Sequence, residues 1–284
     1  MYGRCRSVIH ARQAFDRIEN KSVISWNSII TAYAQNGHSK EALGIFFAMD
    51  PEGVKPNRVT FLAALDACSI ETEQSSNLGR EIHFRIIESG LESEETIANS
   101  LVNMYANFYG RCGNLKEAKQ AFSMAARRDV ISWTAMVSAF AHHGWGEEAL
   151  EIFHAMILDG VLPNSVTLLS ILSACSHSGL LKTAREKFVS MEDDFGIHPL
   201  SDHYDCLVDS LGRAGRIGSV EEMLEFMPFH PGAVVWMSYL SASKVLGDFV
   251  RGERAARMLL DLDPGNCAAY LVVSNMYVST ENEE

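Results

Sequence analysis

The sequence predicts an all-α fold, a right-handed superhelical solenoid of antiparallel helix-turn-helix repeats. Three observations predict it: a long segment recurs at a fixed offset, apolar residues follow helical spacing, and glycine and proline stand at regular places between the apolar stretches. One short helix pair cannot bury its apolar faces alone. Stacked pairs can, and the stack forms a solenoid with a concave face.

An internal repeat organises the chain. The segment Val23–Asn27 (VISWN) recurs 107 residues later as Val130–Thr134 (VISWT), and roughly half of the positions from 23 to 69 are identical in the second copy. A period of 107 residues is too long for one unit of a solenoid. We therefore divide it into three units.

Each unit is predicted to hold two helices. Apolar stripes at i, i+3, i+4 and i+7 indicate a first and then a second helix. Gly37 is expected to end the first helix, because glycine adopts a left-handed backbone cheaply. Ser39 is a candidate N-cap of the second helix, and Pro56 closes the unit. The two stripes consist of Trp26, Ile29, Ile30 and Tyr33, and of Ala42, Ile45, Phe46 and Met49.

Composition and charge set further limits. The 284 residues are 47% hydrophobic, enough to bury a large core. No apolar run reaches the ~18 residues that a membrane span needs. The formal net charge of −12 counts against nucleic-acid binding, although a solenoid can be acidic outside and neutral or basic in its groove. Six widely spaced cysteines without a CxxC pair indicate reduced thiols.

No motif predicts catalysis. The sequence lacks the His-x-Glu and Pro-Cys-x-x-Cys motifs of zinc-dependent cytidine deaminases. It also lacks a glycine-rich phosphate loop and a Gly-x-Ser-x-Gly nucleophile motif. We expect no catalytic residue, no metal ligand and no cofactor.

The repeated motifs resemble the pentatricopeptide repeat family. They are VISWN and VISWT, together with LDAC at Leu65, LGRAG at Leu211 and VVW at Val234. More narrowly, they resemble its plant PLS subclass, in which standard, long and short units alternate. Tyr2–Cys5 (YGRC) matches Tyr109–Cys112, so the first residues are expected to lie inside a repeat, with any targeting segment upstream. The resemblance implies a partial short unit at 1–22, standard units at 23–57 and 130–164, long units at 58–94 and 165–200, short units at 95–129 and 201–231, and a truncated E-type extension at 232–284.

The resemblance also implies that a unit reads one RNA base through its fifth and last residues, a reading pair. The pairs are Asn27 with Asn57, Asn99 with Asp129, and Thr134 with Asn164. They imply a pyrimidine, a uridine and an adenine respectively, with one unspecified base after the first. Amide, hydroxyl and carboxylate groups can pair with a base edge. The alternative from the residues alone is that these side chains only cap helix starts.

Residues at the second position of each unit are implied to stack on the bases. Plain core packing is the alternative. These residues are Ile24, Val59, Thr96, Ile131 and Val166.

As function, the resemblance implies sequence-selective binding of single-stranded RNA in a mitochondrion or chloroplast, as site recognition for C-to-U editing. A deaminase-bearing partner would dock on the extension after Gly232, and no membrane partner is expected. The alternative is a protein-binding scaffold of the tetratricopeptide type. It would explain the acidity, but it predicts about 34 residues in every unit.

Overall fold

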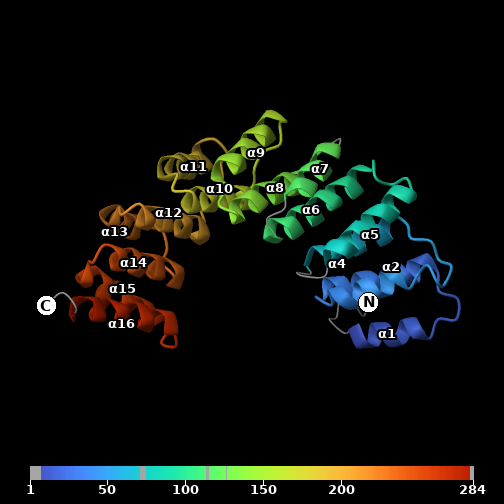
Figure 1. The fold of residues 1–284 in the computed structure, drawn as a ribbon, viewed down its shortest axis with the longest axis horizontal. Helices are drawn as coiled ribbons and strands as arrows, with labels where there is room; N and C mark the ends of the chain where they lie inside the picture. The colour runs from blue at the N-terminus through green and yellow to red at the C-terminus, as the bar shows by residue number, and fades with distance from the viewer. Residues whose placement is uncertain (1–7, 71–74, 113–114, 126, 282–284) are drawn as a thin grey trace. The chain divides into compact units, whose positions relative to one another are not determined.

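The computed structural model describes residues 8–70, 75–112, 115–125 and 127–281, and the regular structure in these ranges is entirely helical (Figure 1). The all-α prediction is confirmed for this part of the chain. The YGRC motif at Tyr2–Cys5 lies outside it. The chain divides into two compact units, an N-terminal unit (Met1–His143) and a C-terminal unit (Gly144–Glu284).

The N-terminal unit has two layers of helices. Its first helices lie side by side, α2 against α4, α4 against α6, and α6 against α8, and each second helix packs on the first helix of its own pair. The bounds are α1 (Val8–Asp16), α2 (Val23–Gln35), α3 (Ser39–Phe47), α4 (Arg58–Ile70), α5 (Ser75–Glu88), α6 (Glu95–Cys112), α7 (Lys116–Met124) and α8 (Val130–His142).

The C-terminal unit repeats this arrangement. Its own first helices lie side by side, α10 against α12, α12 against α14, and α14 against α16, while α11, α13 and α15 form the second layer. The bounds are α9 (Gly146–Leu158), α10 (Ser165–His177), α11 (Leu181–Asp193), α12 (Ser201–Arg213), α13 (Ile217–Phe226), α14 (Ala233–Val245), α15 (Phe249–Leu262) and α16 (Cys267–Glu281).

The turn between α2 and α3 shows how each pair is connected. Gly37 has a φ of +79°. The amides of Gly37 and His38 donate to the carbonyls of Ala34 and Tyr33, so the last carbonyls of α2 are satisfied. The predicted stop at Gly37 is confirmed. Ser39 as N-cap is wrong: the cap residue is His38, and Ser39 is the first residue of α3. The turn ends at His38, so Ser39 lies inside the helix, where its side chain is buried.

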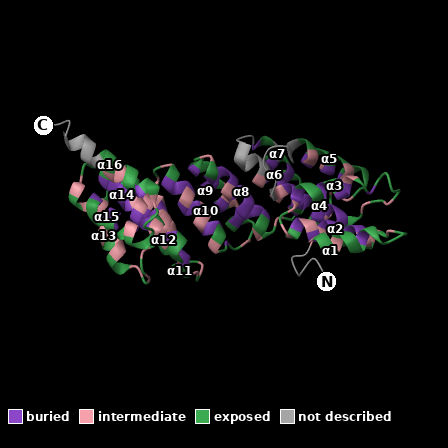
Figure 2. Ribbon diagram, turned by 90° about the horizontal axis from the view of Figure 1, so that it is seen from below, coloured by how far each residue is buried: buried purple, intermediate pink, exposed green. Residues whose placement is uncertain are grey.

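The predicted apolar stripes form the core. Trp26, Ile30, Ala42 and Phe46 are buried, whereas Tyr33 is only half-buried. Figure 2 shows the same pattern in both units, with buried residues on the helix faces that meet a neighbouring helix and exposed residues on the outer faces. Among the described helices, none combines the length and apolarity that crossing a bilayer would take.

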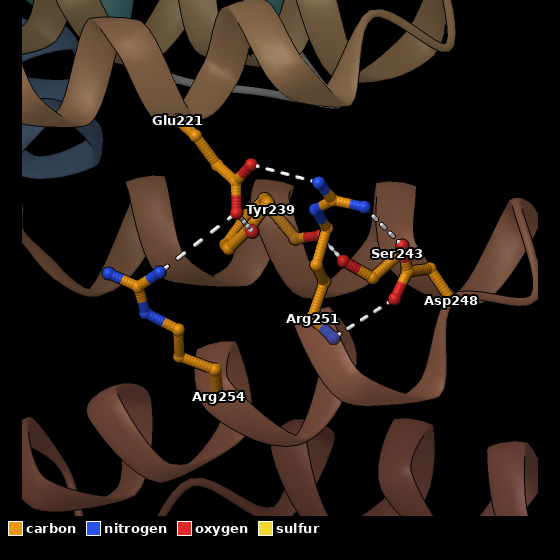
Figure 3. A network of polar contacts seen from close by, with 6 residues as sticks. All are labelled: Glu221, Tyr239, Ser243, Asp248, Arg251 and Arg254. Carbon is orange, nitrogen blue, oxygen red and sulfur yellow. Dashed lines mark hydrogen bonds and ion pairs between the residues drawn. The ribbon is translucent and has the colours of Figure 1, made fainter.

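A polar network joins the predicted extension to the last short unit (Figure 3). Glu221 of α13 accepts hydrogen bonds from the Tyr239 hydroxyl of α14 at 2.7 Å and from Arg251 of α15 at 3.1 Å. Arg254 lies 3.9 Å from the same carboxylate, and Arg251 also pairs with Asp248 at 2.6 Å. The Arg251 and Tyr239 hydrogen bonds lower the pKa of Glu221. α14 and α15 are therefore anchored to α13 by charged hydrogen bonds.

Candidate nucleic-acid interface

The first predicted reading pair is in direct contact. Asn27 lies on α2 and Asn57 precedes α4, and the Asn27 amide nitrogen donates to Asn57 Oδ1 at 3.1 Å. Asn57 Oδ1 also accepts the backbone N–H of Thr60 at 3.1 Å. Asn27 is only 9% exposed, whereas Asn57 is exposed. The fifth and last residues of one unit thus present one joint polar surface.

This pair lies in the wall of a hollow of about 770 Å³, which we call the Asn27 recess. Ile24 and Val59, which are 72% and 52% exposed, also line it. A second hollow of about 320 Å³ shares Val59 and continues toward Ser100 and Asn103 of α6. Aliphatic side chains beside a polar amide pair suit a flat heteroaromatic ligand with a hydrogen-bonding edge.

The second-position residues are on the surface. Ile131 is 59% exposed and Val166 56%, and Thr96 is also exposed. Together with Ile24 and Val59, they rule out core packing as the explanation for this position. Each of these first helices therefore has one exposed side chain near its start. Such a regular series of exposed side chains is what stacking on successive bases would require.

One exposed residue of this kind was missed by the sequence interpretation. Val234 is the second residue of α14 and is 60% exposed. The signal was in the sequence, because VVW at Val234 places a tryptophan two residues later, as VISW does from Ile24 to Trp26. The predicted extension thus exposes an aliphatic side chain at the same helix position as the repeats.

The second pair, Asn99 and Asp129, is linked through Ser132. The Ser132 hydroxyl lies 2.9 Å from Asp129 Oδ1 and 3.5 Å from the Asn99 backbone carbonyl. Asp129 also accepts the Ser132 N–H at 2.8 Å and so caps α8. Asn99 is 8% exposed, and its buried Oδ1 has no hydrogen-bond partner within the described residues. The exposed Asp129 carboxylate is therefore the group of this pair that a ligand can reach.

The two residues of the third pair lie in different compact units of the chain. Thr134 is 9% exposed on α8 of the N-terminal unit. Asn164, in the C-terminal unit, is exposed and forms a capping box with Thr167, whose N–H donates to Asn164 Oδ1 at 2.9 Å. The last residue of this repeat therefore does cap the helix that follows it. This capping does not compete with reading, because it occupies Oδ1 and leaves the amide NH₂ group to pair with a base.

The predicted long units have no polar pair of this kind. Glu94, the last residue of the first long unit, forms an ion pair with Arg58 at 2.8 Å. Arg58 also donates to the Thr96 hydroxyl at 3.1 Å. Leu200, the corresponding residue of the second long unit, is an exposed aliphatic residue. Neither offers a free polar group like that of Asn57.

The C-terminal unit carries negative charge on its row of first helices. Asp202, Asp205 and Asp209 stand at i, i+3 and i+7 on α12, and burial together with the Asp202 charge raises the pKa of Asp205. Arg213 pairs with Asp209 at 2.8 Å. Both of these residues line a hollow of about 740 Å³ between α10, α12 and α14. Phosphate groups are disfavoured near this face.

The cysteines of this unit are poor nucleophiles. Burial raises the pKa of Cys175 to about 11 and that of Cys206 to about 12, so both stay protonated at neutral pH. In the part of the chain that the structure describes, no group of three or more His, Cys, Asp or Glu side chains could hold a metal ion.

Comparison with known proteins points to one repeat family. Residues 21–69 and 128–193 match the model of the PPR repeat family. A mitochondrial pentatricopeptide repeat-containing protein of Arabidopsis thaliana is 38% identical over 98% of this chain and 49% of its own length. The Arabidopsis pentatricopeptide repeat-containing protein CRR2, chloroplastic, is 36% identical over 99% of this chain and 42% of its own length. The chain thus spans less than half the length of these relatives.

Solved structures show the same fold. The crystal structure of the pentatricopeptide repeat protein PPR10 in complex with an 18-nt psaJ RNA element superimposes with a TM-score of 0.61 over 97% of this chain and 45% of that one, at 18% identity. A crystal structure of PPR10 from maize gives a TM-score of 0.53. On the matched repeats, the relatives and the helical-repeat fold together, this chain belongs to the pentatricopeptide repeat family.

Proposed function

We propose that this chain binds single-stranded RNA sequence-selectively and that each reading pair contacts one base. The observation that carries the proposal is the Asn27 recess. It places two exposed aliphatic side chains beside an amide pair formed by Asn27 and Asn57. A base could stack on Ile24 or Val59 while its edge meets the two amides.

The other pairs support different bases. In the Asn99–Asp129 pair the exposed Asp129 carboxylate is an acceptor, and uracil offers an N3–H donor to such a group. For the pair of Thr134 and Asn164, whose hydroxyl and amide can each donate or accept, adenine is the proposed base. With the long unit between the first two pairs left unspecific, the proposed core is pyrimidine, any base, uridine, adenine.

The process is proposed to be organellar RNA metabolism, in a mitochondrion or chloroplast, with recognition of C-to-U editing sites as the specific role. The names of the relatives place them in these organelles. The PLS subclass, with an E-type extension from Gly232, is proposed from the differing lengths of the units read from the sequence. Catalysis would come from a deaminase-bearing partner, and the surface of α14 and α15 would receive it.

The negative charge limits how the RNA is held. Arg58 lies beside the reading face, but its guanidinium is paired with Glu94. Binding should therefore rely on stacking and base-edge hydrogen bonds more than on phosphate neutralisation. The affinity should depend only shallowly on salt, unlike that of a strongly basic binder.

The test is competition against a labelled RNA that contains the proposed core, measured by fluorescence anisotropy with the purified chain. Single-stranded RNA with the core should compete better than RNA with a permuted core. The same sequence in a duplex should not compete, because its base edges are already paired. Equal competition by all RNAs, or no RNA binding, would exclude the proposal and favour a protein-binding scaffold.

A further inference from the structure

A buried hydroxyl accompanies each polar reading pair. The third residue of the helix after each pair is Thr60, Ser132 or Thr167, and all three side chains are fully buried. Each hydroxyl contacts the last-position residue three positions earlier, at distances of 2.9 to 3.1 Å. After Glu94 and Leu200, the last residues of the two predicted long units, the third residue of the helix is instead Ile97 or His203. The hydroxyl therefore occurs with the polar pairs and is absent from the long-unit pairs.

Capping alone does not account for the contacts of Thr60. Its hydroxyl accepts the backbone N–H of Asn57 at 3.0 Å, which completes a capping box. It also reaches the preceding first helix, where Asn27 Oδ1 lies 2.5 Å away. The hydroxyl has one hydrogen, and Asn27 Oδ1 is closer than Asn57 Oδ1 at 3.1 Å. Thr60 therefore donates to Asn27 and accepts from Asn57.

These contacts fix the orientation of both amides. The backbone N–H of Thr60 can only donate, so the Asn57 atom that faces it must be the oxygen. The Asn27 atom that faces Asn57 Oδ1 must then be the nitrogen, which places Asn27 Oδ1 toward the Thr60 hydroxyl. The groups left for a ligand are N–H donors, namely the Asn57 NH₂ group and the second hydrogen of the Asn27 amide.

We propose that Thr60 is a positioning residue that sets the base preference of the Asn27–Asn57 pair by holding both amides in a donor-presenting orientation. This inference rests on the proposed RNA binding. A donor-presenting pair matches the O2 and N3 acceptors of cytosine and the carbonyl oxygens of uracil. Without the hydroxyl, the Asn27 amide is held only by its hydrogen bond to Asn57 Oδ1, so it turns more readily and accepts donor-bearing base edges as well.

The test uses the purified chain and four RNAs that differ only at the base assigned to this pair. The wild type should prefer pyrimidines by roughly tenfold, the size of a good base-edge contact. Thr60→Val, which keeps the shape and removes the hydroxyl, should reduce this preference to about twofold or less. Thr60→Ser, which restores a hydroxyl, should keep the wild-type preference.

Thr167→Val is the matched control, because Thr167 makes the same capping contacts with Asn164. It should not change the preference at the first base. Thr60→Ala serves as a second hydroxyl-free variant if Thr60→Val does not fold, and thermal unfolding monitors both.

The outcomes separate this inference from the proposed function. If Thr60→Val keeps the pyrimidine preference, or lowers affinity for all four RNAs equally, Thr60 only caps its helix and the inference is overturned while RNA binding stands. If the wild type binds none of the four RNAs, the proposed function itself fails.

Discussion

Replacing Ile24 with alanine should weaken RNA binding and leave the fold intact. Ile24 is 72% exposed in the wall of the Asn27 recess, so the free protein loses little packing. The change in the free energy of unfolding should stay within about 0.5 kcal/mol, as for other surface substitutions. Most of the effect should therefore appear only when a base covers the side chain.

The size of that effect follows from the atoms removed. Isoleucine to alanine removes three carbon atoms, each worth about 0.8 kcal/mol when fully buried. A base that stacks on one side covers roughly half of this surface. The loss should be about 1 kcal/mol, or roughly fivefold in Kd. It should be the same for every base at that position, because stacking is tolerant of sequence.

The assay is anisotropy titration of one labelled RNA with wild type, Ile24→Ala and Ile87→Ala. Ile87 is a matched control, since it is also an exposed isoleucine of the N-terminal unit but lies on the second-layer helix α5. Ile87→Ala should bind like wild type. If the two variants lose affinity equally, or if neither does, Ile24 does not contact the RNA and the stacking interpretation fails.

Three further predictions concern the other parts of the chain. Thr134→Asn should shift the preference at the third read base from adenine toward pyrimidine and leave the other positions unchanged, as measured with RNAs varied at that base. A uniform loss of affinity would mean that Thr134 only packs or caps. Asp205→Asn should raise RNA affinity about two- to threefold at low salt and less at high salt, because it removes a negative charge near the phosphates. An unchanged affinity at low salt would show that RNA does not approach α12. Glu221→Gln should lower stability at pH 7 by about 1–2 kcal/mol, the worth of charged hydrogen bonds discounted for partial exposure.

The last of these predictions has a pH signature. The pKa of Glu221 is lowered in the folded state by Arg251 and Tyr239. Its contribution is therefore full above the unfolded pKa of about 4.3 and is lost as the pH falls through the lower folded value. Thermal unfolding from pH 7 to pH 3 should show the wild type and Glu221→Gln converging at the acid end. A constant gap between the two curves would contradict the assigned network.

Much of the fold follows from the sequence because its signals are local and repeated. The helical spacing of apolar residues and the recurrence of Trp26 as Trp133 are enough to place the helix pairs, and both indole side chains are buried. The start of α3 was misjudged by one residue. Serine is a common N-cap, but the turn formed by Gly37 already satisfies the end of α2 and leaves His38 as the cap residue.

The sequence named the proposed reading residues, but it did not show their geometry. The family resemblance pointed to Asn27 and Asn57, and the structure shows that the two side chains meet across 30 residues. The sequence did not show that Asn27 is nearly buried, because that depends on how the next pair stacks on α2. It also gave no sign that Thr60 reaches back to Asn27, since a hydroxyl three residues after an asparagine is an ordinary capping pattern.

Selection of bound RNAs from a randomised single-stranded library tests the central claim most directly. The purified chain is incubated with the library, and the bound RNAs are sequenced against the input. The proposed reading pairs predict enrichment of a four-base core with a pyrimidine, an unspecified base, a uridine and an adenine in that order. Loss of selectivity at the first base alone is predicted for Thr60→Val. Bound RNAs with the same base composition as the input at every position would contradict sequence reading by this chain.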